Sequence, residues 1–419
     1  MKELFPNIKN FKWVRNIIIF FSIMGPGIIT ANVDNDAGGI ATYSLAGAHF
    51  GYSLLWSLIP ITFSLIIIQE MCARMAIATG KGLADLIREN YGVKATFYLM
   101  VVLFLVNLLN VMAEFAGVAA SLEIFHVSRF ISVPLSAFFV WILVVKGTYK
   151  SVERVFLFAC FFYIAYVISG VLAHPDWKEA VEQTMHPQIN WNLDYIVMLV
   201  GLVGTTIAPW MQFYLQASVV EKGLSVEEYR HVRLDVISGC IIAPIVAFFI
   251  IVACAATLFK SGILITSASD AALALKPLAG NYASWLFSFG LFNASIFAAC
   301  ILPLSTSYCI CEGMGWDTGV DKHFSEAPQF FWLYTLMIIL GAGVVLIPGF
   351  PLLRIMYFSQ VGNGILLPFI LIFMHSLINN RDIMGNFVNN RLVNLMTTAT
   401  IAVIIILTLL MAVFSFGAF

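Results

Sequence analysis

Two carboxylates lie within an apolar stretch near the N-terminus of the chain. Asp34 and Asp36 flank Asn35, and Gly38 and Gly39 follow before the apolar run resumes. A carboxylate inside a membrane span is costly and therefore indicates an ion or proton site. Paired glycines lower the cost of unwinding a helix, which frees backbone carbonyls to hold a cation. The alternative is an ordinary helix end at the two glycines, followed by a loop.

The apolar segment 195–219 contains a second interruption. It includes Gly204, Thr205, Ala208 and Pro209. A proline removes a backbone hydrogen-bond donor and clashes with the preceding helical turn. A simple proline kink, which membrane helices tolerate, is the alternative interpretation. Interruptions at corresponding positions of two halves indicate the substrate site of a transporter built from repeats, so we expect the two breaks to meet at one binding site.

The elements that position these residues are predicted to be membrane-spanning helices. Of the 419 residues, 61% are hydrophobic and 11% are charged, whereas a soluble domain carries about 25% charged residues. This composition excludes a disordered chain and a small disulfide scaffold, and a net charge of −1 offers no basic field for nucleic acid. A membrane helix needs about 20 apolar residues. Eleven segments of one transmembrane domain, residues 1–419, meet this requirement, near 16–48, 52–75, 95–122, 130–146, 152–173, 195–219, 235–258, 282–310, 329–348, 352–376 and 394–416.

The basic residues predict how the chain lies in the lipid bilayer. If the N-terminus is cytoplasmic, most of the 22 lysines and arginines fall on the cytoplasmic side of the eleven segments. Short cytoplasmic loops of membrane proteins carry this excess of positive charge. We therefore expect a multi-pass protein of the cell membrane with a cytoplasmic N-terminus and an extracellular C-terminus. The sequence does not determine the oligomeric state.

Short motifs spread over nearly the whole chain follow one another in a known order. They are G-P-G at 25–27, D-A-G-G at 36–39, A-R-M-A-I-A-T-G-K-G-L-A-D-L at 73–86, A-E-F-A-G at 113–117, E-G-M at 312–314, S-Q-V at 359–361 and M-G-N-F-V-N at 384–389. In this order they resemble the NRAMP divalent-metal transporters. The resemblance implies an all-α membrane protein with a LeuT-like fold and eleven transmembrane helices, of which helices one and six are broken. It also implies two inverted five-helix repeats, at about 16–173 and 195–376, and an extra helix at about 394–416.

The resemblance implies a metal site at the two breaks, where this chain departs from the family pattern. The family has Asp-Pro-Gly-Asn in helix one, of which Asp36 is kept and Gly39 replaces the Asn. The family has Met-Pro-His in helix six, where Ala208 and Trp210 replace the Met and the His around Pro209. The site has therefore lost the sulfur donor that the resemblance would supply.

Loss of the thioether changes which ion the site would prefer. Sulfur ligands favour soft or borderline transition metals, whereas oxygen ligands suit Mg²⁺, Ca²⁺ and Mn²⁺. Gly39 and Ala208 also remove side-chain volume, and a wider site suits Mg²⁺, which sheds its water reluctantly. We therefore expect a largely hydrated Mg²⁺, and also Mn²⁺, as transported substrate and no cofactor, a pattern similar to the NRAMP-related magnesium transporters. The predicted metal-site residues are Asp36, Gly39, Thr205, Ala208 and Gln360; the predicted water-mediated or vestibule residues are Asp34, Asn35, Asn363 and Glu114; and the predicted helix-break residues are Gly38, Gly204 and Pro209.

The same departures bear on coupling to protons. Proton coupling requires groups that load and release protons, and Trp210 and Val111 replace the histidine and the third-helix aspartate that the resemblance implies. We therefore expect transport without proton coupling. Glu114 is kept, either as a structural acid between helices or as a functional one. Glu70, near the end of the second span, is either a gate or a helix terminus.

Three alternatives remain at this point. The chain could be a proton-coupled transition-metal importer of the NRAMP type, for Mn²⁺ or Fe²⁺, although Ala208 argues against it. It could be a Na⁺-coupled organic-solute symporter with the same broken helices, although the metal-transporter motifs argue against it. An enzyme is not expected, because the spans contain neither a nucleophile–base pair nor an H-E-x-x-H zinc motif.

Overall fold

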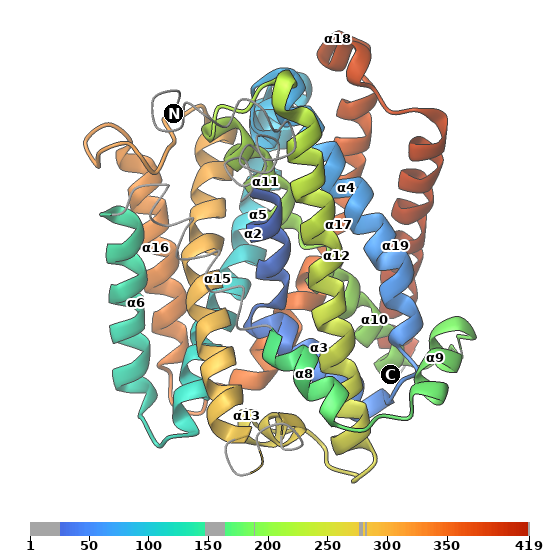
Figure 1. The fold of residues 1–419 in the computed structure, drawn as a ribbon. Helices are drawn as coiled ribbons and strands as arrows, with labels where there is room; N and C mark the ends of the chain where they lie inside the picture. The colour runs from blue at the N-terminus through green and yellow to red at the C-terminus, as the bar shows by residue number, and fades with distance from the viewer. Residues whose placement is uncertain (1–25, 147–163, 188, 276–279, 281–282, 418–419) are drawn as a thin grey trace, which may run out of the picture.

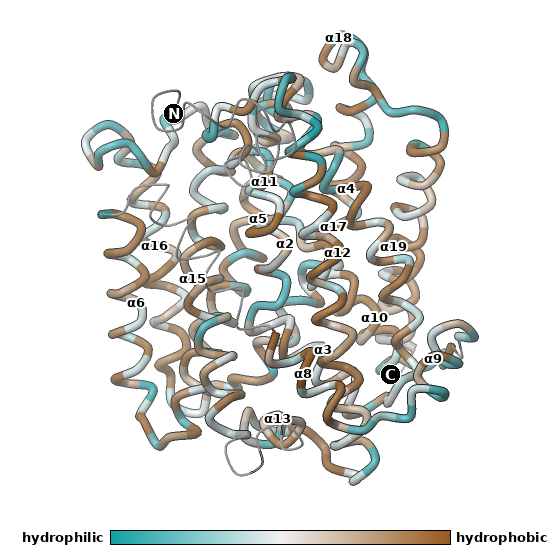
Figure 2. The backbone as a smooth tube through the Cα atoms, viewed as in Figure 1, coloured by the Kyte–Doolittle hydropathy of each residue, from teal (hydrophilic) through white to brown (hydrophobic). Residues whose placement is uncertain are grey.

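The computed structural model describes residues 26–146, 164–187, 189–275, 280 and 283–417, and the regular elements in these residues are all helices (Figure 1). The long helices run side by side as a bundle with two ends. One end carries the short helix α18 (Arg381–Met384) and the other carries α13 (Ala268–Ala272), and we call them the α18 end and the α13 end. Hydrophobic residues fill most of the length between them (Figure 2).

Eight helical segments in the described residues are long and apolar enough to cross a membrane. They are Leu55–Thr79, Leu83–Glu123, Leu193–Glu221, Val226–Phe259, Ser284–Met314, Pro328–Val345, Leu352–Asn379 and Arg391–Phe414. Helix α6 (Arg129–Val145) is apolar but shorter. Most of the predicted fifth span, 152–173, lies outside the described residues, which include only α8 (Ile164–Leu172) there. The all-helical membrane architecture is confirmed, whereas the count of eleven spans and the division into repeats stay predictions.

The helices that make up the bundle have definite bounds. The first span is α2 (Pro26–Asn32), η2 (Val33–Asn35) and α3 (Ala37–Phe50), and the sixth is α10 (Leu193–Thr206) and α11 (Pro209–Glu221). The remaining elements are η3 (Leu55–Ser57), α4 (Leu58–Thr79), α5 (Leu83–Glu123), α9 (Trp177–Met185), η5 (Val226–Glu228), α12 (Tyr229–Cys254), η6 (Ala255–Phe259), η7 (Leu273–Leu275), α15 (Ala283–Met314), α16 (Pro328–Val345), α17 (Leu352–Asn379), η9 (Gly385–Phe387) and α19 (Arg391–Gly417).

Burial separates the central helices from the peripheral ones. The most apolar window of Leu193–Glu221 is 94% buried, whereas that of Arg391–Phe414 is only 17% buried. Without a hydrophobic driving force between helices in lipid, an apolar exposed helix is stable at the rim of a bundle. Helix α19 is therefore a lipid-facing helix, and the broken pair α10 and α11 lies in the interior.

The short helix α2 is fastened to α12 by close backbone packing and by one carboxylate. A Cβ atom on Gly27 would lie 2.6 Å from the Val236 backbone, and one on Gly239 would lie 2.6 Å from the Gly27 carbonyl. Only glycine permits backbones to approach this closely. The Asp235 carboxylate accepts hydrogen bonds from the backbone N–H of Gly27 (2.7 Å) and of Ile28 (3.4 Å), which satisfies free donors at the start of α2.

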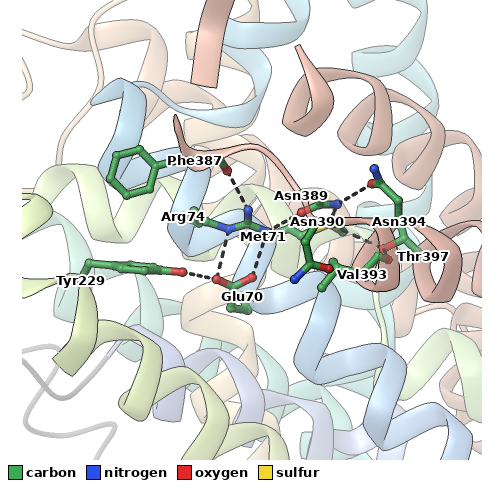
Figure 3. Close-up of polar contacts among 10 residues, drawn as sticks. All are labelled: Glu70, Met71, Arg74, Tyr229, Phe387, Asn389, Asn390, Val393, Asn394 and Thr397. Carbon is green, nitrogen blue, oxygen red and sulfur yellow. Dashed lines mark hydrogen bonds and ion pairs between the residues drawn. The ribbon is translucent and has the colours of Figure 1, made fainter. Parts of the chain in front are cut away.

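A hydrogen-bonded cluster joins three parts of the chain at the α18 end (Figure 3). We call Glu70, Arg74, Tyr229 and Asn389 the Arg74 cluster. Arg74 pairs with both oxygens of Glu70 (3.1 Å each) and donates to the Phe387 carbonyl (2.7 Å) and to Asn389 Oδ1 (2.5 Å). Tyr229 donates its hydroxyl hydrogen to Glu70. Glu70 is therefore neither unpaired nor a bare helix terminus, because it holds α4 and α12 to the loop that precedes α19.

Candidate metal site

The first break is built around Asp36. Helix α2 ends at Asn32, the single turn η2 follows, and Asp36 has extended backbone angles (φ −68°, ψ −174°) before α3 begins. Asp36 Oδ1 accepts a hydrogen bond from the Gly39 N–H at 2.6 Å. Aspartate is a preferred residue at this position, because its side chain satisfies a free N–H of the first helical turn. Figure 2 shows the hydrophilic stretch that results in the middle of the bundle, between α2 and α3.

The second break lies at Ile207 and Ala208. Helix α10 ends at Thr206, and Ala208 has extended angles (φ −68°, ψ 140°). Pro209 is the first residue of α11, where its missing N–H has no helical partner to lose. Pro209 therefore starts a helix and does not kink one.

Two glycines predicted as break residues have a different role. Gly38 lies in the first turn of α3 and Gly204 lies within α10, so neither is at a break. A Cβ atom on Gly204 would overlap the Gln360 carbonyl, and one on Gly38 would overlap the Gln360 side-chain amide. Both glycines are thus explained by the close approach of α17. That these glycines also ease unwinding of the helices stays a prediction.

The helices next to the two breaks lie against each other. A Cβ atom built on Gly39 would lie 3.1 Å from Thr205 Oγ1 and would overlap the Asp34 carbonyl oxygen. Asp36 and Thr205 are 4% and 2% exposed, and Gln360 is 1% exposed. A side chain at position 39 would therefore require the first break to change shape.

Several buried oxygens around the breaks have no hydrogen-bond partner. They are Oδ1 and Oδ2 of Asp34, Oδ1 of Asn35, Oε1 of Glu114 and Oγ1 of Thr205. A buried polar group left unpaired costs about 1–3 kcal/mol, so a cluster of such oxygens indicates a place for a cation or for water that accompanies one. The other Glu114 oxygen accepts from the Ala37 N–H at 3.2 Å, which ties α5 to the start of α3.

Gln360 is held in place by a chain of amides. Its Oε1 accepts from Asn363 Nδ2 at 2.9 Å, and Asn363 exchanges hydrogen bonds with Asn110 at 3.1 and 2.8 Å. Asn363 therefore lies behind Gln360, on the side of α5, and orients it. The predicted role of Asn363 around the metal site, supporting it from the outside or lining the vestibule, stays a prediction.

Ala208 brings no sulfur to the site. Its carbonyl oxygen accepts from Gln212 Nε2 at 3.0 Å, and Gln212 Oε1 accepts from Gln69 Nε2 at 2.8 Å. Sequence reasoning missed this amide pair between α11 and α4. The spacing of four residues from Ala208 to Gln212 was its only local signal, because Gln69 is distant in sequence.

The potential ligands around the breaks are oxygen atoms. Within the described residues, no group of three or more His, Cys, Asp or Glu side chains could hold a metal ion directly. The oxygens present are carboxylates, amides, a hydroxyl and backbone carbonyls, which are the ligands of hard cations. Such a site can hold Mg²⁺ or Mn²⁺ through one or two carboxylates and several waters.

A large cavity at the α13 end stops short of the site. Its volume is about 990 Å³, and Leu45, Asp194, Met198 and Tyr357 are among the residues that line it. The predicted metal-site residues are not part of this lining.

The sequence of the chain matches a family of known transporters. Residues 27–414 match the sequence model of Nramp, described as "Natural resistance-associated macrophage protein-like". The chain belongs to the Nramp family. This Nramp protein is 27% identical to the divalent metal cation transporter MntH of Yersinia enterocolitica, over 92% of this chain and 93% of that protein. It is 28% identical to MntH of Deinococcus radiodurans, over 90% and 86%.

Solved structures share the fold of this Nramp protein. A manganese transporter of Eremococcus coleocola has a TM-score of 0.76 at 19% identity, covering 97% of this chain and 88% of that one. Mhp1, a nucleobase-cation-symport-1 family transporter, has a TM-score of 0.59 at 14% identity, covering 94% and 93%. The LeuT-like fold is thereby confirmed. These relatives are transporters and not enzymes, as the sequence predicted.

Proposed function

We propose that this Nramp protein imports divalent cations, that a largely hydrated Mg²⁺ is its main substrate and Mn²⁺ a second, and that transport is not coupled to protons. The observation that carries the proposal is the set of buried, unpaired oxygens at two facing helix breaks, with Ala208 in place of a sulfur donor. The names of the relatives support divalent metal transport as the general activity.

The expected substrate position is between Asp36 and the backbone of the second break. Asp36 supplies the charge, and Thr205 supplies a neutral hydroxyl oxygen on the facing helix. The Gln360 oxygen accepts from Asn363 and would have to exchange that hydrogen bond to reach the ion. The small side chain of Ala208 leaves room for water beside the ion, whereas the space next to Gly39 is filled by the Asp34 carbonyl. Mg²⁺ gives up its bound water molecules reluctantly. A site with one carboxylate and room for water therefore favours Mg²⁺ over a cation that binds only after it has lost its hydration shell.

The direction follows from the membrane potential. We assign the α18 end to the cytoplasm, because basic residues concentrate in the loops at that end. A dication that moves inward through 100 mV gains about 4.6 kcal/mol, twice the gain of a single charge. The concentration gradient of the cation and the membrane potential are therefore sufficient to drive uptake, and cotransport of a proton is not required.

The test is flux in proteoliposomes with a pH-sensitive dye inside. Mg²⁺, Mn²⁺, Ca²⁺ and Cd²⁺ uptake are compared for the wild type and Ala208→Met. We expect Mg²⁺ and Mn²⁺ uptake without acidification, and a shift toward Cd²⁺ in the variant because a thioether binds soft ions. Failure to transport Mg²⁺, or Cd²⁺ uptake by the wild type that exceeds Mg²⁺ uptake, would overturn the assignment.

A second candidate is a proton-coupled Mn²⁺ or Fe²⁺ importer. The manganese transporter among the similar structures and the buried acids Asp34, Asp36 and Glu114 favour it. It predicts internal acidification in proportion to metal uptake. Replacement of Glu114 by Gln would then remove the acidification, whereas under the main proposal the same variant leaves internal pH unchanged during uptake.

A further inference from the structure

We propose that a second cation site lies between the central site and the α18 end, where Glu312 of α15 and Gln216 of α11 meet the loop that joins α4 to α5. Its ligand is a hydrated divalent cation, Mg²⁺ or Mn²⁺. The identity of the ion rests on the proposed function, whereas the existence of the site rests on the geometry that follows.

Glu312 provides a buried carboxylate with a free oxygen. The residue lies in the last turn of α15 and is 8% exposed, and its Oε2 has no hydrogen-bond partner. The carboxylate lies so close to Gly82 that a Cβ atom there would overlap it. The carboxylate also receives a backbone hydrogen bond from Ala84. One interaction thus fixes Glu312 at the start of α5 while an oxygen stays available.

Gln216 provides a neutral oxygen at the same loop. It is fully buried, its Nε2 donates to the Lys81 carbonyl at 2.9 Å, and its Oε1 has no partner. Lys81 and Gly82 are consecutive residues, so the amide of Gln216 and the carboxylate of Glu312 face the same stretch of backbone. A carboxylate oxygen and an amide oxygen, completed by waters, form a suitable set for Mg²⁺ or Mn²⁺.

The surrounding charge also favours a cation. Glu312 interacts electrostatically with Asp85 and Glu221. The oxygens of Glu221 accept from the Val320 N–H at 3.0 Å and from the Tyr308 hydroxyl.

Both neighbouring acids have a basic group nearby. Asp85 pairs with Arg88 at 3.2 Å, and Lys322 interacts electrostatically with Glu221. The ammonium group of Lys81 is directed to Glu89, at 2.7 Å, and both side chains are largely exposed. Among the described residues Glu312 therefore has no ion-pair partner, and a bound cation would stabilise the ionised form of this buried acid.

The two sites are connected along one face of α11. Ala208, Gln212 and Gln216 follow at intervals of four residues, so they lie on the same face. The distance from the first to the third is about 12 Å along the helix axis. Between them, Gln212 pairs with Gln69, whose Oε1 also has no partner. Amide oxygens therefore lie at successive turns between the central site and Glu312. A hydrated ion that leaves the central site would pass them and bind at the second site before it reaches the cytoplasm.

The experiment counts Mn²⁺ ions bound to the purified full-length protein, from the electron paramagnetic resonance signal of the free ion. We expect two ions for the wild type, one for Asp36→Ala, one for Glu312→Gln and none for the combined variant. Affinity at the second site should fall about 10- to 100-fold in Glu312→Gln, the range for a residue that holds a metal through its waters. Glu227→Gln, which removes an exposed acid at the same end of the molecule, is the matched control and should still bind two.

A gain of binding protects the test against misfolding. Gln216→Glu adds a carboxylate to the second site and should tighten it, a result that an unfolded protein cannot give. A nitroxide on Trp316→Cys, four residues beyond Glu312, should be broadened by the bound Mn²⁺ in Asp36→Ala but not in the combined variant. The proposal is overturned if the wild type binds a single ion that Asp36→Ala removes, or if Glu312→Gln and Gln216→Glu leave the second affinity unchanged. Loss of Mg²⁺ flux with both ions still bound would count against the proposed function alone.

Discussion

Asp34 at the centre of the bundle and Glu70 near its α18 end are both acids inside the protein, but their oxygens have opposite surroundings. Both oxygens of Asp34 lack a hydrogen-bond partner. Both oxygens of Glu70 accept from Arg74, and one also accepts from Tyr229. An unpaired buried oxygen costs stability and a paired one contributes to it. The Arg74 cluster thus holds helices together through a fully paired acid, whereas the acids at the breaks have unpaired oxygens, where we propose that a cation binds.

The largest effect is expected at the centre. Asp36→Ala should abolish Mg²⁺ and Mn²⁺ flux, because the ion loses its main counter-charge in a buried place. The same change removes the N-cap of α3 and should cost only about 1 kcal/mol of stability. Flux in proteoliposomes and thermal unfolding of the purified protein separate the two effects. Flux close to that of the wild type would show that the breaks are not the substrate site.

The opposite pattern is expected at the Arg74 cluster. Arg74→Ala leaves Glu70 buried without its partner, and removal of one member of a buried ion pair costs about 3–5 kcal/mol. The side chains of Arg74 and Glu70 are 10% and 13% exposed, so solvent offsets little of this cost. Unfolding temperature should fall while Mn²⁺ affinity at the central site stays the same. Glu70→Gln combined with Arg74→Gln removes both charges and should recover part of the lost stability.

A smaller change tests selectivity. Ala208→Met should raise Cd²⁺ affinity relative to Mg²⁺ about tenfold, which corresponds to about 1.4 kcal/mol, because the thioether adds a soft ligand. Competition of Cd²⁺ against Mn²⁺ binding measures the ratio. Ala217→Met, on the same helix but beyond the predicted site, is the control for added volume. An equal shift in both variants would contradict a role for position 208 in choosing the ion.

The adjacent residues Thr205 and Thr206 provide the smallest test of the difference between unpaired and paired oxygens. Thr205 Oγ1 has no partner, whereas Thr206 Oγ1 bonds to the Tyr43 hydroxyl and to the Leu202 carbonyl, at 2.9 Å each. Thr205→Val should leave stability nearly unchanged and weaken Mn²⁺ binding a few-fold. Thr206→Val should cost about 1 kcal/mol of stability and leave binding unchanged. If the two variants behave alike in both measurements, hydrogen-bond pairing does not separate substrate ligands from structural groups.

The apolar segments and the interrupted spans could be predicted from the sequence because their causes are local. A carboxylate or a proline within an apolar run disrupts a helix whatever surrounds it. The precise break positions could not be predicted, because Gly38 and Gly204 are small for the sake of α17, a neighbour more than 150 residues away in sequence. From the sequence alone, such a glycine can indicate either an unwound helix or close packing against another helix. Only the positions of the neighbouring helices distinguish the two.

The amide and charge partners were also beyond local reasoning. Glu70 and Arg74 are four residues apart on α4, a spacing that favours an ion pair on a helix. Their further partners, Phe387 and Asn389, come from a loop more than 300 residues later. The Gln69–Gln212 pair has the same character, since it joins α4 to α11. These contacts depend on which helices the fold places side by side.

The fastening of α2 to α12 has a mechanical consequence. A helix of seven residues is too short to be stable alone, so α2 keeps its shape only while Asp235 and the Gly27–Gly239 contact hold it. If α12 tilts, α2 moves with it as a rigid body, and the chain bends at the turn Val33–Asn35. Asp34 lies on this turn and Asp36 follows it directly, so we expect a substitution at Gly239 to change the affinity of the proposed metal site.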